Sequence, residues 1–373
     1  MKIPSRSLSL RTRLSALVLV AGCAVAAGAI AAKKPVTAHR AATKSATAKD
    51  PRQGVLYATR PDAMQLADDI AERRDLERAW VRGAIGRARD LPQITRWVMP
   101  AASGTAKNWR VYRSRFIDPV RIAAGVAFWQ ANAATLERAE REYGVPAEII
   151  VGIIGVETIY GRDTGNFRVM DALATLSLDF PPAHPRASER RAFFQSELEQ
   201  LLSLAKRAGT DPLDFKGSYA GAMGMPQFMP SSWVKYAIDF DGDGRVDLSG
   251  SDADVIGSVA NYFKAFGWQS GMPTHYPVHF EKSRLDLDAL LAPDILPSFS
   301  LASFMAKGAI PEGDGLSHVG PLALVELQNG TAESSYVAGT ENFYVVTRYN
   351  WSSYYAMAVI ELGRAVAAAR PRQ

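Results

Sequence analysis

One glutamate in the sequence occupies a position where a carboxyl group would stay protonated near neutral pH. Four isoleucines between 149 and 154 share one face of an apolar helix that begins at Pro146, and Glu157 continues that face. Burial disfavours the carboxylate, and the negative end of the helix dipole acts in the same direction, so both raise the pKa of Glu157. A protonated carboxyl can act as the general acid in cleavage of a glycosidic bond. The alternative is a structural glutamate paired with Arg162 or Arg168.

A run of small and aromatic residues over 217–233 is a second candidate site. Its glycines and alanines would let a ligand approach the backbone closely. The run also holds side chains that can stack on sugars or hydrogen-bond to them, namely Tyr219, Gln227, Phe228 and Trp233. It lacks the Gly-Lys-Ser/Thr of a phosphate loop, which argues against a nucleotide site. The alternative is a glycine-rich turn between packed helices.

A third candidate site begins at Asp239 and resembles a calcium loop. Carboxylates at positions 1, 3 and 5, followed by glycine at position 6, match the start of an EF-hand loop. These carboxylates belong to Asp239, Asp241 and Asp243. Position 12 is Gly250 instead of glutamate, so Asp252 or Asp254 would have to close the site. The sequence predicts a bound calcium ion, and the alternative is an acidic turn without metal.

Composition and charge exclude several classes of protein. The chain has 373 residues, 47% of them hydrophobic, and a single Cys, which rules out an internal disulfide or a multi-cysteine metal site. Residues 1–59 carry ten Lys and Arg against one Asp, whereas the remainder carries 33 basic and 37 acidic residues. The net charge of +5 therefore comes from the N-terminal tail. Because the body lacks a basic excess, a nucleic-acid partner is not expected.

The N-terminus has the features of a bacterial export signal over 1–31. Basic residues precede a short apolar run over 14–20, and small residues follow. The run 20–23 matches a lipoprotein cleavage site with lipidation of Cys23, whereas 29–31 matches an ordinary small-x-small site. Both alternatives place the protein outside the cytoplasm. Residues 32–55 then predict a flexible tether.

The body is predicted to be mainly helical, with a small sheet near its C-terminus. Helices are expected over 61–143, over 146–160 with a stop at Gly161, and over 188–208, 254–266 and 353–369. Strands are expected over 276–280, 322–327, 336–338 and 343–347, with a hairpin turn at Asn329-Gly330. No internal repeat is visible.

Several long segments together resemble the membrane-bound lytic murein transglycosylase B family of peptidoglycan-cleaving enzymes. The matching runs occur in order and cover most of 60–365. They are 144–158, 171–177, 221–232, 256–268 and 342–350. The resemblance implies a mainly α (α+β) fold, in which a lysozyme-like helical catalytic core is flanked by a helical lobe and a small antiparallel β-lobe. The corresponding domains are the signal (1–31), the tether (32–55), the helical lobe (56–145), the core (146–272, with the calcium loop at 239–254) and the β-lobe with the last helix (273–373).

The resemblance also implies a reaction. The β-1,4 bond between N-acetylmuramic acid and N-acetylglucosamine is cleaved without water, leaving a 1,6-anhydromuramyl end. Glu157 would protonate the leaving oxygen and then, as a carboxylate, take the proton of the sugar's 6-hydroxyl. The substrate's acetamido group would assist, which suits a chain in which no second carboxylate occupies a comparable apolar setting. No catalytic cofactor is expected.

Further site residues follow from the same resemblance. Ser218 would orient the acetamido group, and Arg190 or Arg191 would meet the stem peptide. Sugar-binding positions of the family correspond to Gln227, Phe228, Tyr262, Tyr349 and Asn350. Structural calcium would be held by Asp239, Asp241, Asp243, Arg245 and Asp254, although the spacing to Asp254 is one residue longer than in the family. Met225-Pro226 and Phe193 depart from the family pattern, which affects substrate preference and not the chemistry.

The expected partners are peptidoglycan glycan strands with their stem peptides, together with proteins of cell-wall synthesis or division. The expected location is the periplasm, anchored to the outer membrane through Cys23. Residue Ala24 follows that cysteine, instead of an aspartate that would retain a lipoprotein in the inner membrane. Two alternatives stay open. One is a hydrolytic muramidase that uses the same Glu157 with water, and the other is a non-catalytic peptidoglycan-binding lipoprotein.

Overall fold

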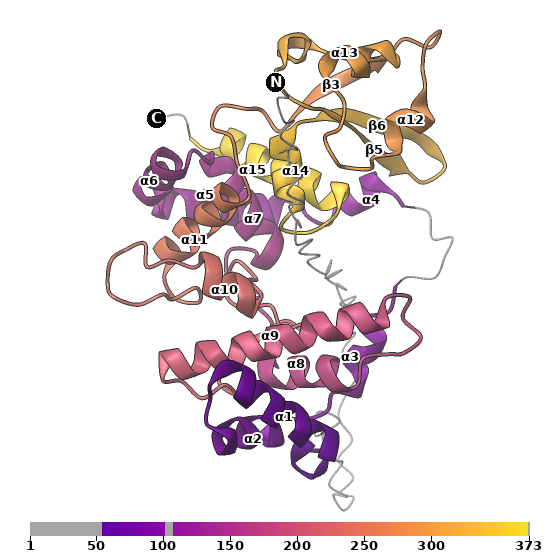
Figure 1. The fold of residues 1–373 in the computed structure, drawn as a ribbon. Coiled ribbons are helices and arrows are strands. Elements are labelled where there is room, and N and C mark those ends of the chain that lie inside the picture. The colour runs from indigo at the N-terminus through magenta and orange to yellow at the C-terminus, as the bar shows by residue number, and fades with distance from the viewer. Residues whose placement is uncertain (1–53, 101–106, 372–373) are drawn as a thin grey trace, which may run out of the picture.

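The structure is a computed structural model that describes residues 54–100 and 107–371, and helices are its main elements (Figure 1). The export signal predicted for 1–31, including Cys23, lies outside the described residues, as does nearly all of the tether predicted for 32–55. Within the described ranges, no helix has both the length and the apolar character that crossing a membrane requires.

The first half of the described chain confirms the helical pattern expected for 61–143. After a short 3-10 helix (Tyr57–Thr59) come α1 (Pro61–Arg74), α2 (Arg78–Arg87), α3 (Pro92–Trp97), α4 (Trp109–Arg113), α5 (Pro119–Ala131) and α6 (Ala133–Tyr143). The next helices are α7 (Ala147–Thr158), α8 (Val169–Leu178), α9 (Ala187–Ala208), α10 (Pro230–Tyr236) and α11 (Asp252–Ala265). The helices predicted over 188–208 and 254–266 are thus confirmed as α9 and α11.

The C-terminal part contains the predicted small antiparallel sheet, in the strand order β4-β3-β6-β5. Its strands are β3 (His275–Phe280), β4 (Ala309–Pro311), β5 (Ala323–Asn329) and β6 (Ala332–Gly339), accompanied by α12 (Leu287–Leu291), α13 (Leu301–Ala306) and a 3-10 helix (Gly313–Ser317). Gly330, at a φ of 69°, lies in the turn between β5 and β6, which confirms the hairpin predicted at Asn329-Gly330. The last helix is confirmed as α15 (Ser353–Ala369).

The strand predicted for 343–347 is wrong, because this segment forms helix α14 (Glu341–Thr347). The Thr340 hydroxyl caps the helix by accepting the N–H of Asn342. The side chain of Asn342 donates to two backbone carbonyls of the segment 269–272. The β-branched and aromatic residues of this segment favour a strand locally, but the cap and the tertiary contacts select a helix.

Helix α7 lies in the largest hydrophobic cluster and packs antiparallel against α15. The two backbones approach closely because glycines lie between them. A Cβ on Gly152 would lie 2.3 Å from the carbonyl oxygen of Val359, and one on Gly363 would lie 2.0 Å from that of Glu148. Helices α5, α6 and α11 also contact α7. This packing brings the last turn of α7, with Glu157, beside the first turn of α15.

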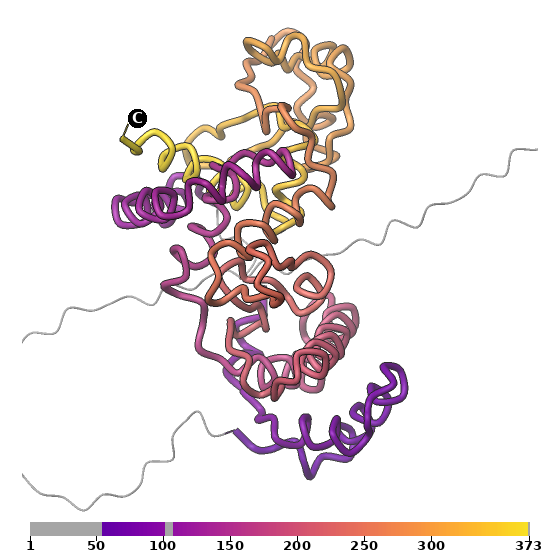
Figure 2. Tube along the Cα trace, turned by 90° about the vertical axis from the view of Figure 1, so that its left-hand side faces the viewer, coloured from indigo at the N-terminus to yellow at the C-terminus, as the bar shows by residue number. Residues whose placement is uncertain are grey.

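Two further hydrophobic clusters lie at opposite ends of the molecule (Figures 1 and 2). One joins α1–α3 to α8 and α9, and the other lies between the β-sheet and helices α12 and α13. The segment 56–145 therefore contributes α1–α3 to the cluster with α8 and α9, and it contributes α5 and α6 to the largest cluster, which contains α7. The predicted domain boundaries at 145 and 272 remain predictions, and they do not coincide with the limits of these clusters. The fold class itself, mainly helical with a small antiparallel sheet, is confirmed.

Candidate active site

Helix α7 ends at Thr158, one residue after Glu157, and not near Gly161 as the sequence predicted. The Thr158 hydroxyl accepts the N–H of Gly161 at 3.0 Å and donates to the carbonyl of Met225 at 2.8 Å. The two residues after Thr158 have positive φ values of 51° and 56°, which are strained for residues that carry a Cβ. The chain therefore turns away immediately after Glu157, and this turn is held by the segment around Met225.

The carboxyl group of Glu157 is partly buried and has one hydrogen-bond donor among the described side chains. The Tyr355 hydroxyl, from the first turn of α15, donates to Glu157 Oε1 at 2.5 Å. Burial raises the pKa of Glu157 from 4.5 to about 7, and the hydrogen bond from Tyr355 opposes part of that rise. Within the described chain, Glu157 forms no ion pair, and Arg168 binds Asp171 instead. The alternative of a glutamate paired with Arg162 or Arg168 is therefore wrong.

Tyrosine side chains surround Glu157. Burial raises the pKa of Tyr112 to about 12, and the nearby charge of Glu157 contributes to that rise. Burial also raises the pKa values of Tyr349 and Tyr355, again with a contribution from Glu157. The rings of Tyr349 and Tyr355 stack with centroids 6.4 Å apart. A carboxyl group in this setting can exchange a proton near neutral pH without a charged partner.

Sequence reasoning missed Tyr112 and Tyr355. A tyrosine near the start of an amphipathic helix is read as part of the core, and Tyr355 indeed has only 3% of its surface exposed. Its position in the turn capped by Ser352 was readable from the sequence. Its contact with Glu157, 198 residues earlier, was not.

Three predicted sugar-binding aromatics lie inside the core beside Glu157. Phe228, Tyr262 and Tyr349 are 2%, 3% and 6% exposed, respectively. Their rings contact one another, with centroids 5.6 Å apart for Phe228 and Tyr262 and 4.8 Å apart for Tyr262 and Tyr349. The Tyr349 hydroxyl donates to the carbonyl of Pro226, and that of Tyr262 donates to the carbonyl of Arg348. This packing leaves Phe228 no exposed ring face on which a sugar could stack.

The glycine-rich segment lies beside the loop that follows α7. Strand β2 (Lys216–Gly217), at its start, pairs with β1 (Phe167–Arg168). The side-chain amide of Gln227 donates to the carbonyl oxygens of Thr164 and Gly224 at 3.1 and 2.9 Å. Of the two alternatives from the sequence, the tight turn is present, and the role of the segment as a binding site remains a prediction. The segment turns tightly, and the side chain of Gln227 hydrogen-bonds it to the loop that follows α7.

Three other predicted site residues differ in their surroundings. The Oγ of Ser218 accepts the N–H of Ala222 at 3.0 Å. The side-chain amide of Asn350 is partly exposed and makes no hydrogen bond to another described residue, which leaves it available to a ligand. The guanidinium of Arg190 lies over the rings of Phe193 and Phe194 on α9, in the cluster that α9 forms with α1–α3. The structure thus places Arg190 on a different hydrophobic cluster from Glu157.

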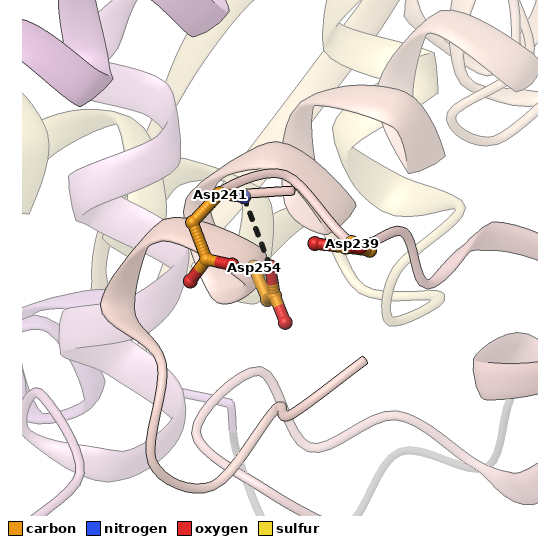
Figure 3. Close-up of side chains that lie close together, drawn as sticks. All are labelled: Asp239, Asp241 and Asp254. Atoms are coloured by element: carbon orange, nitrogen blue, oxygen red, sulfur yellow. Dashed lines mark hydrogen bonds between the residues drawn. The ribbon is translucent and has the colours of Figure 1, made fainter. Parts of the chain in front are cut away.

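The acidic loop brings three of its predicted ligands together. Carboxylate oxygens of Asp239, Asp241 and Asp254 lie within 4.8 Å of one another (Figure 3). Asp254 is 1% exposed and accepts the backbone N–H groups of Phe240 and Asp247 at 2.7 and 2.8 Å. Oxygen ligands that are gathered and oriented in this way suit a hard cation such as Ca²⁺.

The remaining acidic residues of the loop do not join that group. The carboxylate of Asp243 accepts the N–H of Arg245 at 2.8 Å, and that of Asp252 accepts the side-chain amide of Asn132 at 2.8 Å. Of the two closing residues considered from the sequence, the structure therefore selects Asp254. Asp254 lies in the first turn of α11, beyond the glycine at position 12 of the loop.

This chain is similar to known proteins along most of its length. Residues 58–364 match the Transglycosylase SLT domain family. The chain is 40% identical over 330 residues to the membrane-bound lytic murein transglycosylase B of Escherichia coli strain K12, covering 84% of this chain and 85% of that protein.

Two solved structures extend the comparison. The Escherichia coli lytic transglycosylase SLT35 in complex with calcium has a TM-score of 0.72 and 40% identity, covering 86% of this chain and 99% of that one. SltB3 from Pseudomonas aeruginosa in complex with NAG-anhNAM-pentapeptide has a TM-score of 0.66 and 27% identity, covering 83% of this chain and 82% of that one. With its family match over 58–364, this chain belongs to the Transglycosylase SLT domain family.

Proposed function

We propose that this protein is a peptidoglycan lytic transglycosylase in which Glu157 serves as both the acid and the base. The observation that carries the proposal is a partly buried carboxyl group, with its pKa raised to about 7, that is bonded to Tyr355 and has no ion-pair partner among the described residues. Such a group is protonated often enough to act as an acid and ionised often enough to act as a base at neutral pH. One group can therefore perform both proton transfers.

The reaction has two steps. Glu157 donates its proton to the oxygen between N-acetylmuramic acid and N-acetylglucosamine, and the bond from C1 to that oxygen breaks while the acetamido carbonyl of the muramic acid bonds to C1. The 6-hydroxyl of the same sugar then attacks C1, the acetamido oxygen leaves, and the Glu157 carboxylate takes the hydroxyl proton. The enzyme returns to its starting state, and the product carries a 1,6-anhydro ring.

The surrounding residues would bind and orient the sugar. Ser218 and Asn350 are the partly exposed polar side chains that would contact the acetamido and hydroxyl groups, with Gln227 beside them. Tyr355 would hold Glu157 in position through its hydrogen bond. Phe228, Tyr262 and Tyr349, whose side chains are almost wholly buried, would support these sugar-binding residues from the core. Arg190 would meet the stem peptide.

Calcium would act in folding and not in the reaction. Asp239, Asp241 and Asp254 would supply carboxylate oxygens. Asp243, after a turn of its carboxylate toward the ion, and the backbone carbonyl of Arg245 would complete the ligand set. The ion would connect the loop after α10 to the start of α11. That calcium accompanies the related SLT35 structure supports this assignment.

The protein would act in the periplasm, attached to the outer membrane by a lipid on Cys23. The name of the membrane-bound relative supports membrane association. Lipid attachment would be tested by labelling cells with a radioactive fatty acid. The wild-type protein would carry the label and would sediment with the outer membrane. A Cys23→Ser variant would carry no label and would not sediment with that membrane. Retention of the label by the variant would overturn the assignment.

The test of the reaction is mass spectrometry of the fragments that the purified protein releases from cell-wall sacculi. Glu157→Gln would be compared with Glu148→Gln, a matched change in the first turn of the same helix. We expect anhydro-muropeptides from wild type and from Glu148→Gln, and none from Glu157→Gln. Fragments heavier by one water would establish a hydrolytic muramidase instead. Binding of sacculi without any release, by wild type and variants alike, would establish a non-catalytic binding protein.

A further inference from the structure

Trp97, the last residue of α3, is the most exposed aromatic residue among those that the structure describes. Half of its surface (50%) is accessible, whereas the other large hydrophobic residues that are strongly exposed in 54–100 and 107–371 are all valine or leucine. A single exposed hydrophobic residue is common on proteins, so its surroundings decide whether it has a role. Nothing in the reaction proposed above uses this indole.

The indole of Trp97 is held in place by two other rings. Its centroid lies 5.9 Å from that of Phe167 and 5.4 Å from that of Tyr219, with interplanar angles of 82° and 79°. Ile94, one turn earlier on α3, is fully buried in the cluster that contains α8 and α9, which anchors the helix. The indole is therefore ordered while half of the residue stays exposed. A side chain that is already ordered loses little entropy when a ligand binds to it.

Both supporting rings come from the backbone next to Ser218. Tyr219 directly follows Ser218 in the chain. Phe167 lies in β1 and pairs with Gly217 of β2, which is the residue before Ser218. Trp97 thus lies beside the segment whose serine would hold the acetamido group of the substrate in the proposed function.

A pyranose ring fits this indole better than other ligands do. The C–H groups on one face of an N-acetylated sugar can pack against an aromatic ring while its hydroxyl groups stay in water. A protein partner needs an interface of roughly 800 Å² on each side, far more than one half-exposed ring provides. A nucleic acid would also stack on an indole, but residues 60–373 lack the basic excess that such a partner requires.

We propose that Trp97 is a stacking surface for a further sugar ring of the bound glycan strand, beyond the muramic acid that Ser218 would hold. Phe167 and Tyr219 would keep the indole in the orientation that the sugar meets. This assignment rests on the proposed function, since it takes a glycan strand as the substrate. It adds that the affinity for a strand depends on whether the strand is long enough to reach Trp97.

The kinetic test uses peptide-free glycan strands of graded length. Trp97→Ala should raise KM for long strands by about threefold to tenfold, because it removes one stacking contact. The value of kcat, and KM for the shortest strand that is cleaved, should stay within about twofold of wild type. Trp97→Phe keeps a smaller ring and should recover part of the affinity. Equal KM changes for short and long strands, or no change for either, would overturn the proposal.

The matched control for these variants is Trp80→Ala. Trp80 is a partly exposed tryptophan of α2 that packs against the same hydrophobic cluster, and its ring lies 5.4 Å from the ammonium group of Lys206. This variant should leave KM unchanged at every strand length. A rise in KM for long strands in the control as well would show that the effect comes from the cluster and not from a sugar at Trp97.

A binding measurement separates this proposal from the reaction itself. N-bromosuccinimide oxidises accessible indoles, and mass spectrometry of tryptic peptides reports the oxidation rate of each tryptophan. In the Glu157→Gln variant, saturating long glycan strands should slow oxidation of Trp97 by at least about threefold and leave Trp80 unaffected, whereas monomeric N-acetylglucosamine should protect neither. Unprotected Trp97 in a protein that releases anhydro-muropeptides would overturn this inference alone. Protection of Trp97 in a protein that cleaves no glycan would overturn the proposed reaction and leave the sugar contact standing.

Discussion

The Tyr355 hydroxyl donates a hydrogen bond to Glu157 across 198 residues of sequence and between two antiparallel helices. Burial raises the pKa of Glu157 to about 7, and this bond limits the rise, since it stabilises the carboxylate form. The proton affinity of the proposed catalytic group is thus set by two opposing effects. Both originate from the packing of α7 against α15.

Replacing Tyr355 with Phe should raise the pKa of Glu157. A hydrogen bond to a charged group contributes about 1.5–3 kcal/mol, so the loss corresponds to about one to two pH units. The basic limb of kcat/KM against pH, where the acid loses its proton, should therefore move to higher pH. The profile of the variant, measured on a defined glycan substrate, would be compared with that of Tyr354→Phe. An unshifted basic limb would mean that Tyr355 does not bond to Glu157 during the reaction.

Replacing Glu157 with Gln should stabilise the protein at alkaline pH. The folded-state pKa of about 7 lies above the ordinary value of 4.5, so the folded state binds the proton more tightly than the unfolded chain does. The contribution of Glu157 to stability is thus fully present below pH 4.5 and is lost as the pH rises through 7. Glutamine mimics the protonated form and keeps its stability, so the variant should exceed wild type by up to about 3 kcal/mol above pH 7. Urea unfolding at pH 4.5 and pH 8 measures this, and a difference independent of pH would contradict it.

The close packing around helix α7, which carries Glu157, should require a glycine at position 155. A Cβ at this residue would lie 2.5 Å from the hydroxyl of Tyr160, whose buried oxygen has no hydrogen-bond partner among the described residues. Gly155→Ala should therefore destabilise the protein by about 1–3 kcal/mol. Tyr160→Phe removes the unpaired hydroxyl and should be neutral or stabilising. In a double-mutant cycle read by urea unfolding, the Phe variant should recover part of the loss. Strict additivity would show that the hydroxyl is not the obstacle.

Removal of calcium should lower the melting temperature and leave the chemistry of Glu157 unchanged. At a calcium concentration a hundred times its Kd, the bound ion stabilises the folded state by about 2.7 kcal/mol. Asp254→Asn removes the buried ligand of the acidic loop and should abolish the response of the melting temperature to calcium. Asp288→Asn, an exposed change on α12, should leave that response intact. If calcium still stabilised the Asp254→Asn variant fully, Asp254 would not be a calcium ligand.

Local patterns in the sequence were sufficient for much of the fold. The apolar face ending at Glu157, the hairpin at Asn329-Gly330 and the last helix at 353–369 were all predicted correctly. The pattern failed at 343–347, where β-branched residues form a helix because the hydroxyl of Thr340 and the amide of Asn342 fix its start.

What the sequence by itself determined was the identity of the candidate acid and of two of the three acidic groups that could hold an ion, Asp239 and Asp241. A carboxylate on an apolar helix, and aspartates spaced along a short loop, are local features that periodicity and spacing reveal. What only the tertiary structure decided was which groups surround them. Tyr355 reaches Glu157, and Asp254 instead of Asp252 reaches Asp239, because helix packing brings together residues whose separation in the sequence follows no rule. The burial that raises the pKa of Glu157 arises from that packing, so it appears only in the folded chain.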